Sequence, residues 1–239
     1  MAEHISFLWS RPEPEPDPTY PVTRADLAAI VVGLADAEGP GAVTVARVAA
    51  ALGDRAPGMD RQVEMPVDVV DLLVDTAFGE IALPAASGDW RTDLRALAVA
   101  TRETLGRHPW LAVLVQTRPL LGPNALRHIE FAFAALDGHG LDAATVDCYA
   151  GLVIGSVFGS GALAWTELEA QKEWIGEYTE LDFHDLLGPV FAHAVSCGLY
   201  PTYGRFLAAG APHPTSEASF DLGLECLLDG LAARIPPAL

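Results

Sequence analysis

A group of arginines and small residues between positions 44 and 61 has the spacing of a nucleic-acid contact. The stretch TVARVAAALGDRAPGMDRQV, residues 44–63, contains a short apolar periodic segment, a glycine-bearing turn and a second short segment. This is the pattern of a helix-turn-helix unit, whose second helix lies in the major groove of DNA. The residues that we expect to contact DNA are Thr44, Arg47, Arg55, Ala56, Pro57, Gly58 and Arg61.

Each polar residue in this group also has a purely structural interpretation. Thr44 is better explained as the N-cap of a helix than as a phosphate contact, and Arg47 is better explained as a solvated residue on the helix face. Arg55 and Arg61 could reach base edges, but each follows an aspartate directly and could form a local ion pair instead. Gly58 weakens a helix by about 1 kcal/mol relative to alanine.

The charge of the chain conflicts with this interpretation. The sequence has 14 basic and 32 acidic residues among 239, and a formal net charge of -18. Proteins that bind nucleic acids normally have a basic face, because neutralising phosphates supplies most of the sequence-independent affinity. Residues 22–80 alone contain four arginines and ten acids, so the acidity extends into the segment expected to bind DNA.

Several stretches resemble the TetR family of ligand-responsive transcriptional repressors. ADAEGPGAVTVARVAAALG, APGMDRQV and DVVDLLVD resemble its N-terminal domain. GDWRTDLRALAVATRETLGRHPWLAVL, RPLLGPNALRHIE and FDLGLECLLDGLAA resemble one C-terminal subgroup. The resemblance implies a three-helix domain that binds operator DNA and a larger helical domain that dimerises and holds a small ligand.

The segment expected to read DNA departs from the family pattern. The pattern typically ends in Leu-Tyr-x-His followed shortly by Lys, and its aromatic hydroxyl and lysine grip backbone phosphates. Met59, Asp60, Gln62 and Pro66 stand at these four positions here. Two phosphate contacts are therefore replaced, one of them by a like charge, which opposes docking on DNA.

Hydrophobic periodicity predicts an all-α fold. The expected helices run from a capping box at Thr23 and Asp26 to Gly39, from Thr44 to Gly53, from Pro66 onward, from Asp89 to about His108, and from Trp110 toward Gln116. Others follow Gly122, with Leu126, Ile129, Phe133 and Leu136 buried, and cover residues 142–169, about 185–197 and 216–234. We expect an arm over residues 1–21, extended and solvated at 11–18, a helix-turn-helix domain over 22–65, and a ligand-binding and dimerisation domain over 66–239.

The stretch from Cys148 to Trp165 has no charged residue and carries a glycine at every fourth place. Its 18 residues are at the lower limit of a membrane span, but acidic residues flank it and no basic residue anchors it, which favours a helix buried on all sides. We therefore expect it to lie between the core of its own domain and a second copy of the chain. The family resemblance implies a homodimer with interface residues Gly155, Gly159, Phe220, Leu224, Leu227 and Leu231; the alternative is that these residues pack within a monomer.

The family resemblance also implies an enclosed pocket for a small hydrophobic effector. Its candidate lining residues are His108, Trp110, Gln116, Arg118, His128, Phe131, Tyr149 and Trp165, although for any single one of them a core or surface role is favoured. No catalytic motif is found, so we expect no enzyme activity and no cofactor. His193 and Cys197 could supply two metal ligands, but no further ligand pair has suitable spacing, so no metal site is expected.

Three scattered cysteines suggest neither a disulfide framework nor a metal site, and the N-terminus lacks the features of a signal peptide. A cytoplasmic location fits both observations. The sequence therefore predicts a TetR-like ligand-responsive repressor with weakened DNA binding. The alternative is a dimeric small-molecule-binding or regulator-titrating module that has lost operator binding.

Overall fold

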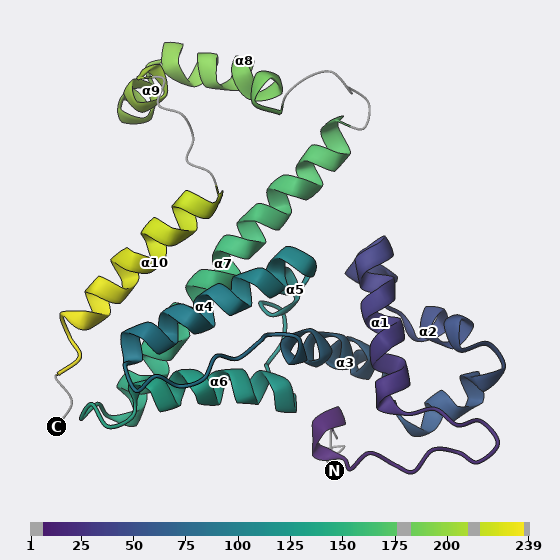
Figure 1. Cartoon of the computed structure of the whole chain (residues 1–239). Helices are drawn as coiled ribbons and strands as arrows, with labels where there is room; N and C mark the ends of the chain where they lie inside the picture. The colour runs from purple at the N-terminus through teal and green to yellow at the C-terminus, as the bar shows by residue number, and fades with distance from the viewer. Residues whose placement is uncertain (1–6, 176–182, 210–215, 237–239) are drawn as a thin grey trace, which may run out of the picture.

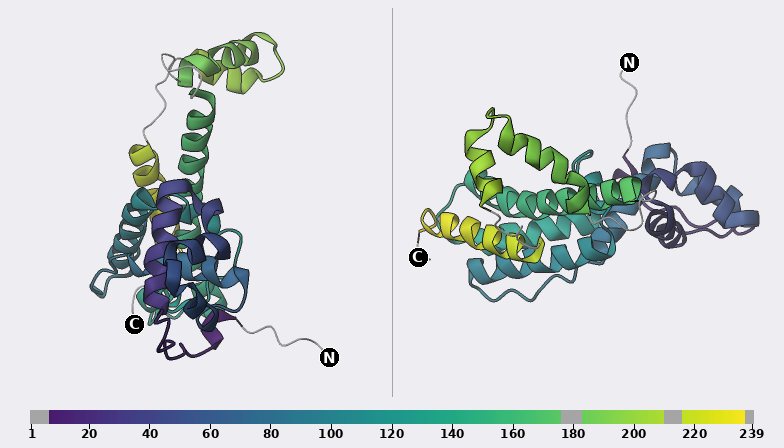
Figure 2. Two further views of the ribbon diagram at one scale, coloured as in Figure 1. Left: turned by 90° about the vertical axis from the view of Figure 1, so that its right-hand side faces the viewer. Right: turned by 90° about the horizontal axis from the view of Figure 1, so that it is seen from above.

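The computed structural model describes residues 7–175, 183–209 and 216–236, and every regular element within these ranges is a helix (Figure 1). The expectation of an all-α fold is therefore confirmed. Two short 3-10 helices accompany the N-terminal part, η1 (Leu8–Ser10) and η2 (Pro40–Ala42). The helices form an N-terminal group around α1 and a larger group around α7, seen from two further sides in Figure 2.

The N-terminal group begins with α1 (Arg24–Glu38) and α2 (Val45–Leu52). The capping box predicted for α1 is present, since the Thr23 side chain accepts from the Asp26 amide and the Asp26 carboxylate accepts from the Thr23 amide. Thr44 caps α2, because its hydroxyl oxygen accepts from the Arg47 amide at 3.3 Å. Gly53 ends α2 with a φ of 58°, a conformation that glycine adopts without steric cost.

The second helix of the helix-turn-helix differs from the expectation. Residues Gly53–Arg61 form a 3-10 helix, η3, instead of an α-helix. Pro57 lies inside it and cannot donate a backbone hydrogen bond, and Gly58 lowers the helical propensity further. The segment that would enter a DNA groove is therefore a tighter and less regular element than the sequence pattern indicated.

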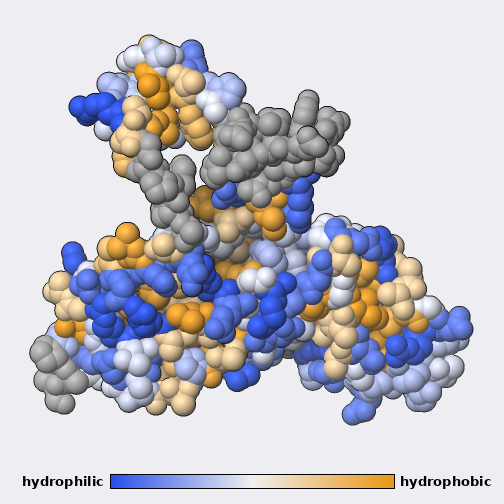
Figure 3. All heavy atoms as spheres, turned by 45° about the horizontal axis from the view of Figure 1, so that its top comes forward, coloured by the Kyte–Doolittle hydropathy of each residue, from blue (hydrophilic) through white to orange (hydrophobic). Residues whose placement is uncertain are grey.

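The larger group contains α3 (Pro66–Gly79), α4 (Trp90–Arg107), α5 (Leu111–Leu114), α6 (Pro123–Leu136), α7 (Ala143–Ile175) and α10 (Ser216–Ala232). Helix α3 packs against α1 and also against α6, so it connects the two groups. The hairpin of α8 (Phe183–Ser196) and α9 (Pro201–Ala208) packs on itself and lies beyond the ends of α7 and α10 (Figures 1 and 2). Figure 3 shows hydrophobic residues on its surface.

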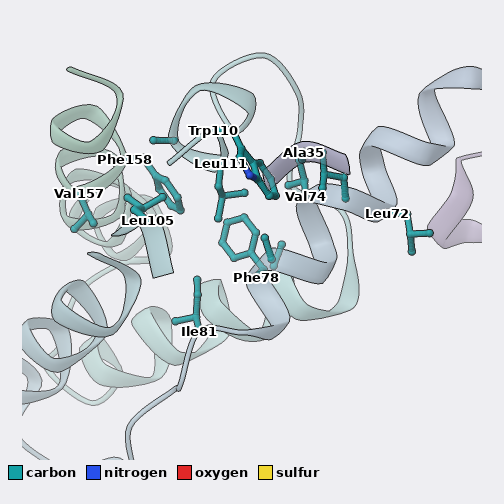
Figure 4. Packing of buried hydrophobic residues seen from close by; sticks show 14 of the residues in the cluster. Ala35, Leu72, Val74, Phe78, Ile81, Leu105, Trp110, Leu111, Val157 and Phe158 are labelled. Atoms are coloured by element: carbon teal, nitrogen blue, oxygen red, sulfur yellow. The ribbon is translucent and has the colours of Figure 1, made fainter. Parts of the chain in front are cut away.

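The core joins both groups through aromatic and aliphatic side chains from α1, α3, α4, α5 and α7 (Figure 4). Phe78 of α3 lies 5.6 Å from the Phe158 ring of α7 between ring centroids. Of the four residues expected to be buried on α6, Leu136 is fully buried and Ile129 and Phe133 are half-buried, but Leu126 is 51 % exposed. Ala125, His128 and Ala132 are buried in addition. The small side chains allow α6 to approach α3, α4 and α7 closely.

Helix α7 is covered on one side only within a single chain. Ala150, Val153 and Val157 face the core, whereas Leu152 and Leu163 are 47 % and 75 % exposed. The expectation that this helix is buried on all sides is therefore not met by one chain alone. Residues Ala143–Ala170 are long and apolar enough to cross a membrane by length and composition, a criterion that core helices also meet.

His128 is the most deeply buried ionisable ring of the core. Its Nε2 lies 2.8 Å from the Thr101 hydroxyl, and its ring packs edge-on against Phe78. Burial lowers the pKa of His128 to about 4 from the usual 6.5. The unfolded chain therefore binds this proton more readily than the folded chain does, and stability is lost as pH falls from about 6.5 toward 4.

We predict that protonation of His128 in the unfolded state removes about 2 kcal/mol of stability between pH 7 and pH 5. In His128→Asn, which keeps a polar group near Thr101 but cannot titrate, this part of the pH dependence should disappear. Urea unfolding at both pH values measures the difference. His193→Asn on the exposed surface of α8 should keep the wild-type dependence, and an unchanged slope in His128→Asn would contradict the prediction.

Candidate DNA-binding surface and ligand pocket

The exposed arginines near the helix-turn-helix are each engaged by an acidic residue of the same chain. Arg47 pairs with Glu38, Arg55 with Asp26 at 3.4 Å, and Arg61 with Asp17 at 3.2 Å. Both Arg55 and Arg61 are thus ion-paired, but not with the adjacent Asp54 and Asp60 that the sequence suggested. Their partners lie in the N-terminal arm and on α1, which local sequence cannot reveal.

The arm of residues 7–21 is extended but is not free in solvent as expected. Leu8 is fully buried, and the Arg11 guanidinium donates to the buried Asp68 carboxylate at 2.6 Å and also pairs with Glu64. The Glu13 carboxylate accepts from the Arg24 amide at 2.8 Å. The acidic residues of the arm thus bind donors of α1 and the helix-turn-helix, and Asp17 reaches the last arginine of η3.

Two residues of the recognition segment, the stretch of residues 53–66 expected to read DNA, pack against this arm and are buried. Gln62 is 1 % exposed, and its amide donates to the carbonyl oxygens of Val22 at 2.9 Å and Pro14 at 3.3 Å. Gly58 is buried, and a Cβ atom there would lie 2.0 Å from the Tyr20 carbonyl oxygen. The expectation that Gly58 contacts DNA is therefore wrong, because the arm passes directly over it. Ala56 is half-buried and Pro57 is exposed.

His108 and Trp110 lie at the junction of the two helical groups, where Trp110 also lines a cavity of about 400 Å³. The Asp36 carboxylate of α1 accepts from the Trp110 indole at 2.7 Å and lies 2.7 Å from His108 Nδ1. Glu80 lies 2.9 Å from His108 Nε2 and also pairs with Arg107. Burial opposes protonation of His108, but the hydrogen bonds to the two carboxylates outweigh it and raise its pKa. The junction therefore gains stability at low pH and loses it as pH rises through this raised pKa.

A pocket of about 310 Å³ lies between α4, α7 and α10. Its walls are mostly apolar, and Arg102 supplies a charged group whose guanidinium carbon lies 4.4 Å from the centre of the Phe220 ring. Trp165 and Leu168 of α7 line the other side. An apolar cavity with a small number of polar groups is the usual form of a small-molecule site.

Of the residues expected to line a ligand pocket, Trp165 lines this one, Trp110 and Trp165 line the cavity at the junction, and Arg118 lines a third cavity. His128 is a core residue, Gln116 is exposed, and Phe131 and Tyr149 are partly buried against the core. The sequence analysis missed Arg102 and Phe220 as pocket residues. Nothing in the sequence distinguishes Arg102 from the other arginines of α4, because the contact depends on α10 crossing α4.

The residues expected at a dimer interface fall into two groups. Phe220, Leu224 and Leu231 are buried within their own chain, so they are not available to a partner, and Leu227 is half-buried. These side chains pack inward because α10 lies on α4 and α7. Gly155 and Gly159 lie on the uncovered side of α7, where a Cβ atom would meet nothing within 4 Å. Among the described residues, no group of His, Cys, Asp and Glu converges to hold a metal.

Comparisons with known proteins agree with this arrangement. The family model described as "Tetracyclin repressor-like, C-terminal domain" matches residues 83–235. An HTH-type transcriptional regulator of Saccharopolyspora erythraea is 32 % identical over 232 residues, which cover 95 % of this chain and 91 % of the relative. The HTH-type transcriptional repressor DrrR1 of Streptomyces coeruleorubidus is 30 % identical over 243 residues, covering 98 % and 87 %.

Solved structures show the same fold. The TetR family protein ActR of Streptomyces coelicolor in complex with actinorhodin has a TM-score of 0.71 at 22 % identity, covering 92 % of this chain and 99 % of ActR. Apo ActR has a TM-score of 0.69 at 22 % identity, covering 89 % and 98 %. The fold and the relatives define a helical transcriptional regulator with an N-terminal helix-turn-helix and a C-terminal helical domain, not an enzyme. The chain belongs to the TetR family of transcriptional regulators.

We predict that Gly58→Ala displaces the arm. The added Cβ atom would collide with the Tyr20 backbone, so the free energy of unfolding should fall by about 1–3 kcal/mol. The arm should also become more sensitive to proteinase K. Gly33→Ala is the matched control, because its Cβ meets nothing within 4 Å on α1 and should stabilise the chain by about 0.5–1 kcal/mol. Equal behaviour of the two variants would show that the arm does not depend on Gly58.

Proposed function

We propose that this regulator is a dimeric, ligand-responsive repressor whose affinity for operator DNA is reduced by its own acidic residues. The observation that carries the proposal is the pairing of Arg47, Arg55 and Arg61 with carboxylates of the same chain. A phosphate can engage these arginines only by replacing a carboxylate. The net gain on binding DNA is therefore smaller than for free arginines.

The positions that grip phosphates in the family pattern support the same proposal. Asp60 is exposed and brings a negative charge to the place of the aromatic hydroxyl. Gln62 is committed to the arm, and Pro66 begins α3 without a charge or a backbone donor. Thr44 is used as the N-cap of α2, and its own backbone amide donates to the Ala42 carbonyl oxygen at 3.0 Å.

The second candidate function is a dimeric small-molecule-binding or regulator-titrating module without operator binding. The same intramolecular ion pairs favour it, because they leave the helix-turn-helix without an unpaired exposed arginine among residues 44–61. The two functions differ in one measurable property. A repressor with reduced affinity retains selective binding at low salt, whereas the module has none.

We further propose that the pocket between α4, α7 and α10 holds a small, largely apolar effector. ActR has been solved in complex with actinorhodin, and its fold is similar to that of this chain. Arg102 would supply the polar contact and the aromatic rings of Trp165 and Phe220 the apolar ones. Since α10 forms one wall and α4 leads to the junction at His108, an occupant could change how the two helical groups pack.

The dimer interface is proposed to include the uncovered side of α7. Leu152, Gly155, Gly159 and Leu163 follow one another at spacings of three and four residues, so they share one face of the helix. The two glycines allow the helix of a partner to approach closely. On α10 the exposed large hydrophobic residue is Leu222, which is 69 % exposed.

We also propose that the regulator acts in the cytoplasm, because its fold requires no disulfide bond.

Restoring the family residues should strengthen DNA binding. We expect wild type to bind the DNA upstream of its own gene no more tightly than the micromolar range at physiological salt, with a steep salt dependence. Asp60→Tyr combined with Pro66→Lys should tighten binding by about tenfold or more, because it removes a repulsive charge and adds two phosphate ligands. Fluorescence anisotropy with labelled duplexes measures both affinities.

The control is Glu130→Lys on the exposed surface of α6, which changes the net charge by the same amount away from the helix-turn-helix. It should change the affinity much less than the double substitution. Nanomolar, sequence-selective binding by wild type would contradict reduced affinity. If neither wild type nor the double variant binds selectively at low salt, the module without operator binding is the correct function.

A charge on the uncovered side of α7 should dissociate the dimer. Leu163→Glu places a carboxylate at a position that is 75 % exposed in one chain and would be buried between two. Sedimentation velocity should show a dimer for wild type and a monomer for the variant at micromolar concentration. Leu126→Glu on α6, also exposed, should remain dimeric. A wild-type protein that sediments as a monomer at this concentration would contradict the proposed dimer.

A further inference from the structure

A second cavity, of about 290 Å³, lies outside the pocket proposed for the effector. Three segments enclose it: the arm with Phe7 and Trp9, the first half of α3, and the segment between α5 and α6. Most of its lining is apolar. It therefore sits where the arm, the connecting helix α3 and the C-terminal group meet.

The polar groups of this cavity are few and carry an excess of negative charge. Asp71 pairs with Arg118, and both side chains are 18 % exposed. Asp75 is almost fully buried and accepts from the amides of Asn124 and Ala125 at 2.9 and 3.0 Å. The Asn124 side-chain amide also donates to Asp75 Oδ2 at 3.1 Å, so donors at the start of α6 hold Asp75, and Asp71 alone pairs with the guanidinium. The cavity thus contains two carboxylates and one guanidinium. Burial raises the pKa of both carboxyl groups, so a second cation at the cavity would favour their charged forms.

The geometry of the cavity is maintained by specific contacts. The Asp75 carboxylate occupies the space where a Cβ of Gly122 would lie, at 2.1 Å from Oδ1, so a glycine is required at that position. Arg118 leaves its Nε buried without a hydrogen-bond partner. The ring of Trp9 forms part of the wall and is fixed from its other side by Arg24, whose guanidinium carbon lies 5.9 Å from the ring centre.

We propose that this cavity is a second small-molecule site, which takes an apolar ring compound carrying one protonated amine. The ring would lie against Trp9, Val67 and Val74, and the ammonium group would lie at Asp71 and Asp75. Burial of the apolar ring supplies affinity, and the excess of carboxylates selects the cation over a neutral or anionic analogue. An occupant would contact both the arm and the segment between α5 and α6. It would bind only when the arm is packed in this position, and binding would therefore stabilise the arm there.

Three probes with the same ring system test the charge preference: 1-naphthylmethylamine, 1-naphthylmethanol and 1-naphthylacetate. Isothermal titration calorimetry of the full chain at pH 7 should give a dissociation constant for the amine about tenfold lower than that for the alcohol. The difference between the amine and the acetate should be larger. Equal affinities, a preference for the acetate, or no saturable binding of the amine at millimolar concentration would each overturn the proposal.

Variants locate the binding site. Val67→Trp fills the mouth of the cavity at an exposed position, and Asp71→Asn removes one of its charges. Each should weaken binding of the amine by about tenfold, as should Trp9→Ala by removing part of the apolar wall. Ser160→Trp, which fills the pocket between α4, α7 and α10, should leave it unchanged. Loss of binding in Ser160→Trp but not in Val67→Trp would place the amine in the other pocket and refute the second site, whatever the DNA titrations show.

Discussion

The ion pair between Arg11 and the buried carboxylate of Asp68 determines where the N-terminal arm lies. Asp68 is fully buried and also accepts from the amides of Glu64 and Met65, so its charge is held by three donors at the start of α3. Removing one partner of such a pair leaves an uncompensated buried charge, at a cost of about 3–5 kcal/mol. The arm is therefore fixed at one end, and the residues that follow must pass over η3.

This path explains why the recognition segment is unusual in more than one respect. The arm occupies space beside Gly58 and uses the amide of Gln62, and its Asp17 reaches Arg61. A bulkier residue at position 58 or a phosphate-binding side chain at position 62 would be incompatible with the arm in this place. Gln62 therefore departs from the family pattern at a position where its amide holds the arm, so packing against the arm accounts for this departure.

Local signals in the sequence predicted most of the helix starts, but α9 was not expected and α7 continues to Ile175, past the expected end at residue 169. Non-local contacts account for the errors in burial. The capping box at Thr23, the N-caps at Thr44 and Asp89 and the stop at Gly53 each depend on neighbouring residues, and the structure confirms them. On α6 the prediction failed at Leu126, which is more hydrophobic than Ala125 or His128, because close packing of helices favours the smaller residues. The expectation of a solvated arm was wrong because the residues that bind the arm, Asp68 and Gln62, lie more than forty residues away along the chain.

The candidate sites were harder to predict than the fold for the same reason. His108 and Trp110 have the chemistry of ligand-binding residues, but Asp36 and Glu80 satisfy them at the junction of the two helical groups. This position gives them a different role. Because α4 ends at His108 and also forms a wall of the pocket with Arg102, a shift of α4 toward an occupant would move His108 relative to Asp36 on α1. The hydrogen bonds at the junction are short and charged, so even a small displacement would weaken them. The pocket and α1 are thus connected through α4 and the Asp36 carboxylate, while the arm contacts the other end of α1 at Arg24.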